Sequence, residues 1–101
     1  MADDSPNVDP KLVDLTKITI DSIAVKSLPE HVARRYNVLP IKRDNSAIPN
    51  RLMVVISASN ATTIGMVGMN DIKVFTRCSI TWILADSTSI EDAINRAYAS
   101  L

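Results

Sequence analysis

The chain has 101 residues, of which 47% are hydrophobic and 22% charged, and its formal net charge at pH 7 is zero. This composition is typical of one globular domain and excludes a disordered chain of low hydrophobicity and high charge. One cysteine excludes an intrachain disulfide. No apolar run is long enough to span a membrane, and the acidic start of the chain is unlike a signal peptide. We therefore expect a cytoplasmic protein without direct membrane insertion.

The chain opens with residues that predict no regular structure. Residues 1–12 are acidic and polar, and Pro6 and Pro10 interrupt them, so we expect a flexible acidic tail. Residues 13–101 are expected to form a single domain. The first apolar residues of this domain mix helix and strand periodicity, which favours a short strand near Lys17–Ile20 followed by a turn of helix.

A helix is predicted from the segment Ser27-Leu28-Pro29-Glu30. Its Ser and Glu stand at capping-box spacing, and proline suits the first helical position. Glu30 and Arg34 are spaced for a surface ion pair. Asn37 can adopt the left-handed conformation that ends a helix.

The middle of the chain predicts two strands. Val38–Lys42 and Leu52–Ser57 are rich in β-branched residues and are separated by a polar stretch, which indicates a hairpin-like pair. Met53–Ile56 is a continuous apolar run of the kind found in a central strand covered on both faces.

A second helix and a third strand follow. Residues 60–76 have apolar positions at helical spacing, with Ser59 or Asn60 as the cap, although Gly65 and Gly68 disfavour a helix. We interpret Gly65 and Gly68 as allowing a close helix-to-sheet contact. Ser79–Ala85 is the third strand, which makes a βαβ unit with the second.

The last helix has the clearest pattern. Thr88 and Glu91 form a capping box, and apolar residues recur at helical spacing, namely Ile90, Ala93, Ile94, Ala97, Tyr98 and Leu101. The fold class is therefore predicted as α/β (α+β), with a small, mostly three-stranded sheet, a βαβ crossover and three to four helices.

The sequence contains no arrangement that points to catalysis. His31 is the only histidine, and it lies on the predicted exposed side of a helix without an acid or a second ligand nearby. No phosphate-binding glycine motif is present, and Gly65-Met66-Val67-Gly68 lacks the basic residues that nucleic-acid-binding GXXG loops prefer. We therefore expect a protein that is not an enzyme, with no cofactor, no metal site and no catalytic residues.

Positive charge gathers in the middle of the chain. Residues 1–25 have five acids and two bases, residues 26–51 have six bases and two acids, and residues 52–101 have three bases and four acids. The candidate partner-binding residues lie in the middle segment and are Arg34, Arg35, Lys42 and Arg43. They suit a phosphate or an acidic protein surface, or they form only a solvated face. No aromatic residues interleave with them, so nucleic acid is not an expected partner.

Several segments, taken in order, resemble one family. They are Leu28-Pro29-Glu30, Ala33-Arg34-Arg35-Tyr36, Val38-Leu39-Pro40-Ile41, Leu52-Met53-Val54-Val55, Asp71-Ile72, Leu84-Ala85, and Ile90 with Ala93-Ile94 and Tyr98. The pattern is similar to the amino-terminal domain of type II secretion and type IV pilus assembly ATPases, the bacterial general secretory pathway protein E. The resemblance implies an α/β domain that precedes a P-loop motor and docks it onto the cytoplasmic part of an inner-membrane platform protein.

The chain departs from that family at three places. Ser59-Asn60 stands where the family usually has Asp-Pro, and Thr76-Arg77 replaces a tight Thr-Gly turn. Some relatives bind cyclic di-GMP through a motif that begins Arg-Leu-Gly, which is absent here, so the resemblance gives no support for that ligand. The given sequence contains no motor, and we expect either a fragment of a larger protein or a stand-alone adaptor. The expected function is a non-catalytic protein-docking module, and the alternative is a regulatory nucleotide-binding domain that uses the basic face.

Overall fold

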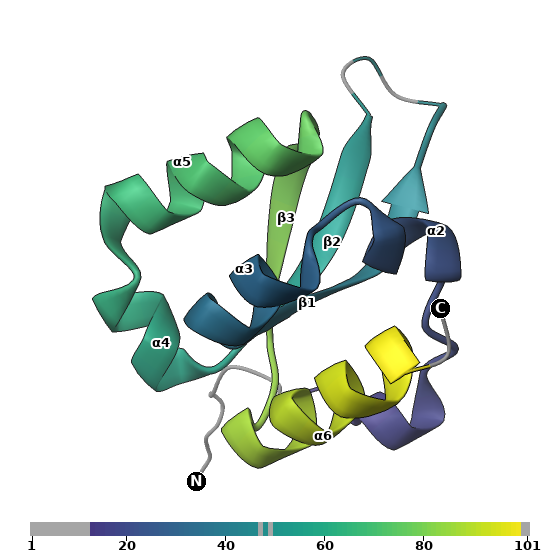
Figure 1. The fold of residues 1–101 in the computed structure, drawn as a ribbon, viewed down its shortest axis with the longest axis vertical. Coiled ribbons are helices and arrows are strands. Elements are labelled where there is room, and N and C mark those ends of the chain that lie inside the picture. Colours follow the sequence, from purple (N-terminus) through teal and green to yellow (C-terminus); the bar gives the residue numbers. More distant parts are fainter. Residues whose placement is uncertain (1–12, 47, 49, 100–101) are drawn as a thin grey trace, which may run out of the picture.

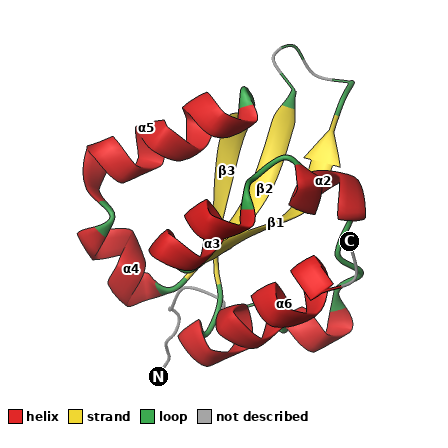
Figure 2. Ribbon diagram, viewed as in Figure 1, coloured by secondary structure: helices red, strands yellow, loops and turns green. Residues whose placement is uncertain are grey.

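The computed structural model describes residues 13–46, 48 and 50–99, and Figure 1 shows its fold. The elements in chain order are a 3-10 turn η1 (Leu15–Lys17), helices α2 (Ser22–Lys26) and α3 (Glu30–Tyr36), strands β1 (Val38–Asp44) and β2 (Arg51–Ile56), helices α4 (Ala58–Thr63) and α5 (Gly65–Thr76), strand β3 (Ser79–Leu84) and helix α6 (Ser87–Ala99). One sheet packed with helices confirms the α+β class (Figure 2). In the described part of the chain, no helix is long and apolar enough to cross a membrane.

The sheet has three strands in the order β1-β2-β3. β1 pairs antiparallel with β2, and β2 pairs parallel with β3, so α4 and α5 form the crossover of a βαβ unit. This arrangement confirms the predicted hairpin pair and the central place of the second strand. The register of β1 shifts between Pro40 and Lys42, where proline cannot donate a ladder hydrogen bond.

The core lies where the helices cover the sheet. α2, α3 and α6 pack against β1, and in Figure 1 α3 lies between α5 and α6. Side chains that are almost fully buried come from every layer, including Leu28, Leu39, Val54, Ile56, Ile72, Ile90 and Ile94. Burial of this apolar surface is the main source of stability for a domain of this size.

The first predicted strand is wrong. Residues near Lys17–Ile20 leave the η1 turn and lead into α2 without joining the sheet. The Asp14 carboxylate accepts a hydrogen bond from the Thr16 backbone, and Asp21 accepts one from the Ile23 backbone. Two aspartates therefore cap two short turns, which competes with extended structure. The predicted acidic tail, residues 1–12, lies outside the described residues.

The predicted capping boxes are also wrong, although the left-handed end at Asn37 is confirmed by its φ of 54°. Ser27 belongs to the end of α2, where its hydroxyl donates to the Ile23 carbonyl, and α3 starts after Pro29 without a side-chain cap. At α6 the carboxylate of Asp86 accepts from the backbone of Thr88 and of Ser89. A carboxylate at this position also favours the helix dipole.

The long helix predicted over residues 60–76 is two helices, so the described residues form five α-helices where three to four were predicted. Gly65 has a φ of 67°, a left-handed conformation that separates α4 from α5. The Ser57 hydroxyl, rather than Ser59 or Asn60, caps α4. Gly68 is buried against Ile64 and the ring of Tyr36, so its close contact is made with α3 and not with the sheet.

Candidate functional site

The structure places the four predicted partner-binding residues on two elements. Arg34 and Arg35 lie on α3, and Lys42 and Arg43 lie near the end of β1. Each pair meets different neighbours. The two pairs are therefore described separately.

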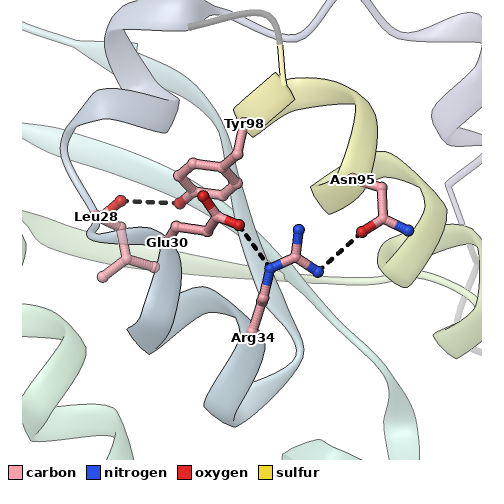
Figure 3. A network of polar contacts seen from close by, with 5 residues as sticks. All are labelled: Leu28, Glu30, Arg34, Asn95 and Tyr98. Atoms are coloured by element: carbon pink, nitrogen blue, oxygen red, sulfur yellow. Dashed lines mark hydrogen bonds and ion pairs between the residues drawn. The ribbon is translucent and has the colours of Figure 1, made fainter.

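Arg34 joins two helices (Figure 3). Its Nε donates to Oε2 of Glu30 at 2.7 Å, which confirms the predicted ion pair, and its Nη1 donates to Oδ1 of Asn95 at 2.8 Å. Nearby, the Tyr98 hydroxyl donates to the Leu28 carbonyl oxygen at 2.8 Å. Burial raises the pKa of Tyr98 to about 12, so the hydroxyl keeps its proton at neutral pH. The Arg34 guanidinium is thus engaged between α3 and α6.

Arg35 is exposed and stands over an aromatic ring. Its guanidinium carbon lies 5.6 Å from the centre of the Tyr36 ring, which is cation-π distance. The Tyr36 hydroxyl donates to Oδ2 of Asp71 at 2.8 Å, and this bond raises the pKa of Tyr36. Tyr36 therefore links α3 to α5 while it supports Arg35 from below.

Lys42 and Arg43 line a groove of about 440 Å³ at one end of the sheet. The other lining residues are Asp44, Arg51, Met53 and Thr81. Strand register explains the grouping, because Lys42 pairs with Met53, which in turn pairs with Thr81. The three side chains lie next to one another across three strands.

Two cations, Lys42 and Arg51, share the groove face with one carboxylate, that of Asp44. Arg51 stands opposite Asp44 in the hairpin register. Hydrogen bonds from the hydroxyl and backbone of Ser46 lower the pKa of Asp44, and Arg51 and Lys42 lower it further. Arg43 pairs with the buried Leu52, and its guanidinium donates to the Ser27 hydroxyl at 2.7 Å, so its charge lies on the helix-covered face of the sheet. The net positive charge suits a carboxylate or phosphate group of a partner.

Arg51 is the cation of the groove that sequence reasoning missed. It stands at the start of β2, eight positions along the chain from Arg43. The signal was available in the hairpin, because antiparallel pairing of the two predicted strands brings their outer ends together. The loop length alone did not reveal the register.

The residues weighed for chemistry are apart from one another. The His31 ring lies 6.4 Å from the Phe75 ring in an edge-to-face arrangement, and Cys78 is buried. Across the described ranges, no three His, Cys, Asp or Glu side chains gather in a way that could hold a metal ion. The groove of Lys42, Asp44 and Arg51 is therefore the candidate site.

Comparisons with known proteins agree with this fold. The model of the MshEN domain family matches residues 9–101. A solved structure described as "Structure of MshE with cdg" is similar at a TM-score of 0.71 and 22% sequence identity. The match covers 88% of this chain and 59% of that chain, so the present sequence spans less than two thirds of its neighbour. No curated protein matches the chain.

Proposed function

Since the chain belongs to the MshEN domain family, the N-terminal domains of type II secretion and type IV pilus ATPases, we propose that it is a non-catalytic docking and regulatory module. Its proposed partner is the cytoplasmic part of an inner-membrane platform protein. The observation that carries the proposal is the groove at the end of the sheet, where the cations Lys42 and Arg51 outnumber the carboxylate of Asp44.

The charge of the groove suits a protein surface that presents carboxylates. Lys42 and Arg51 lie on an open face of the sheet, and Met53 adds an apolar contact between them. Exposed charges of this kind raise the association rate and make binding depend on salt. Partner binding at the groove is therefore expected to weaken as ionic strength rises.

The test is isothermal titration of the chain with the purified cytoplasmic domain of the platform protein. We expect the double variant Lys42→Glu, Arg51→Glu to weaken binding by about tenfold or more at low salt and by less at high salt. The matched control is Lys17→Glu, Lys26→Glu, which reverses two exposed charges on η1 and α2 and should bind normally. Equal affinities of the two double variants would contradict the proposal.

Nucleotide binding is the second candidate, and the description of the similar structure with cdg favours it. The cations of the groove could also pair with the phosphates of cyclic di-GMP. Titration with cyclic di-GMP, ATP and GTP, followed by NMR shifts of backbone amides, separates the two functions. Saturable shifts at Lys42, Arg51 and Thr81 would favour the nucleotide. Shifts produced only by the platform domain would favour docking.

A further inference from the structure

Helix α5 carries most of the exposed large hydrophobic residues of the described chain. Met66, Val67, Val74 and Phe75 are 79%, 75%, 73% and 50% exposed, and beyond α5 only Ile23 and Ile48 are comparable. Single exposed apolar residues are ordinary on a protein surface, whereas a cluster on one element marks an interaction site.

The helix is apolar on two opposite sides. Positions four apart form rows along a helix, and the row Gly68, Ile72 and Thr76 is buried against the rest of the domain. The opposite row consists of Met66, Asn70 and Val74, all exposed. A surface helix that packs only against its own domain has a polar outer row. Two of the three residues in this outer row are apolar, which indicates that the row packs against another molecule.

Positive charge borders the outer row on one side only. Lys73 and Arg77 lie four positions apart, and with Asn70 and Val74 they line a groove of about 540 Å³ that continues to Cys78 and Ser79. In the described part of the chain neither Lys73 nor Arg77 has a side-chain ion pair. Both side chains are exposed.

The other border of α5 faces α3 and is already occupied. Asp71 accepts the hydrogen bond of the Tyr36 hydroxyl, and Phe75 contacts the His31 ring. The unpaired charge along the outer row is therefore one-sided and positive.

We propose that the outer face of α5 together with its C-cap, defined as Met66, Val67, Asn70, Lys73, Val74 and the cap residue Arg77, binds a helix of a partner protein. That helix carries an apolar row with carboxylates along one border. The proposal rests on the docking function and adds a second contact surface, distinct from the groove of Lys42 and Arg51. Ridges of side chains from the partner helix fit beside α5 in the manner of ordinary helix packing.

Two other occupants fit the observations less well. An anionic membrane is matched best by cations on both borders of an apolar row, whereas Lys73 and Arg77 border the outer row on one side only. A second copy of the chain could offer α6, whose Glu91 and Asp92 are exposed, but the apolar row of α6 is buried in its own core through Ile90 and Ile94.

The test uses a synthetic amphipathic helix with leucines along one row and glutamates along one border, and a second peptide with lysines in place of the glutamates. Fluorescence anisotropy measures the affinity, and backbone NMR shifts locate the site. We expect the glutamate peptide to bind at α5 and the lysine peptide to bind about tenfold or more weakly. Two double variants test the face. One carries Met66→Ser and Val74→Ser, and the other carries Lys73→Glu and Arg77→Glu. Each should weaken binding of the glutamate peptide by about tenfold or more.

Matched controls are Ile23→Ser, which removes an exposed apolar side chain from α2, and Lys17→Glu, Lys26→Glu. Equal binding of both peptides, shifts outside α5, or no effect of the α5 variants would overturn the inference. A different occupant of α5 would also overturn the inference. In that case the glutamate peptide does not bind, and the chain either sediments with phosphatidylcholine/phosphatidylglycerol vesicles or dimerises. The double variant Met66→Ser, Val74→Ser then loses that sedimentation or dimerisation.

The two proposals fail separately. If the platform domain binds through Lys42 and Arg51 while no peptide reaches α5, the docking function stands and this inference is wrong. If the glutamate peptide binds α5 while the platform domain does not bind the chain, the proposed partner is wrong and the α5 surface stands.

Discussion

Gly68 sets how closely α5 approaches α3. A Cβ atom at this position would lie 2.5 Å from Cγ1 of Ile64 and 3.1 Å from Cε1 of Tyr36. Both distances are shorter than ordinary van der Waals contact, so an added methyl group must displace its neighbours. The close approach also places Tyr36 for its hydrogen bond to Asp71. The absence of a side chain at Gly68 therefore helps to fix the orientation of α5 against α3.

We expect Gly68→Ala to lower the free energy of unfolding by about 1 to 3 kcal/mol, because overpacking outweighs the better helix propensity of alanine. Urea unfolding measures the change. Repeating the substitution in an Ile64→Ala background is the control, since that change removes Cγ1, and the cost should then fall by more than half. An unchanged cost in that background would show that the Ile64 contact is not its source.

At the scale of the element, α6 tests whether the apolar row was placed correctly. Ile94 is 1% exposed and belongs to the core, whereas Asn95 is exposed and accepts a hydrogen bond from Arg34. Ile94→Ala should cost about 2 to 5 kcal/mol, and Asn95→Ala about 1 kcal/mol or less. The midpoint and slope of urea unfolding measure both. Similar losses in the two variants would mean that the row of α6 is phased differently.

Elements with a strong hydrophobic pattern were predictable from the sequence. The apolar run of β2 and the repeating row of α6 depend on burial, which the sequence records directly as periodicity. Short segments were not predictable in the same way. η1 and α2 depend on single side-chain caps from Asp14 and Asp21, and the same residues are equally compatible with a turn or with the end of a strand.

The helix boundary at Gly65 shows another limit. Glycine lowers helix propensity at Gly65 and at Gly68 alike, yet only Gly65 adopts the left-handed conformation that breaks the helix. Gly68 continues α5 and serves as a contact point. The difference depends on the tertiary neighbours Ile64 and Tyr36, which local sequence does not specify.

At the scale of the whole molecule, the basic segment was predictable from the sequence. Its separation into cations held within the domain and cations that line an open groove was not. Arg34 is held between Glu30 and Asn95, whereas Lys42 lies beside Arg51 in an open groove. Charge counting along the chain treats these residues alike, because it contains no information on which guanidinium has a partner. The exposed face of α5 was missed for a related reason. Its apolar residues look like core residues until the buried row is known.

The basic pair Arg34 and Arg35 and the basic pair Lys42 and Arg51 can be compared by their effect on the affinity for the platform domain. Arg34→Glu, Arg35→Glu places a carboxylate next to Glu30 and removes the bond to Asn95, so it should lower the free energy of unfolding by about 1 kcal/mol. Because Arg34 is already engaged within the domain, we expect this variant to weaken binding of the platform domain less than Lys42→Glu, Arg51→Glu does. Titration calorimetry at low and high salt measures both affinities, and circular dichroism checks that each variant is folded. A larger and more salt-sensitive loss of affinity for the Arg34 and Arg35 variant would place the docking contact on α3 instead of the groove.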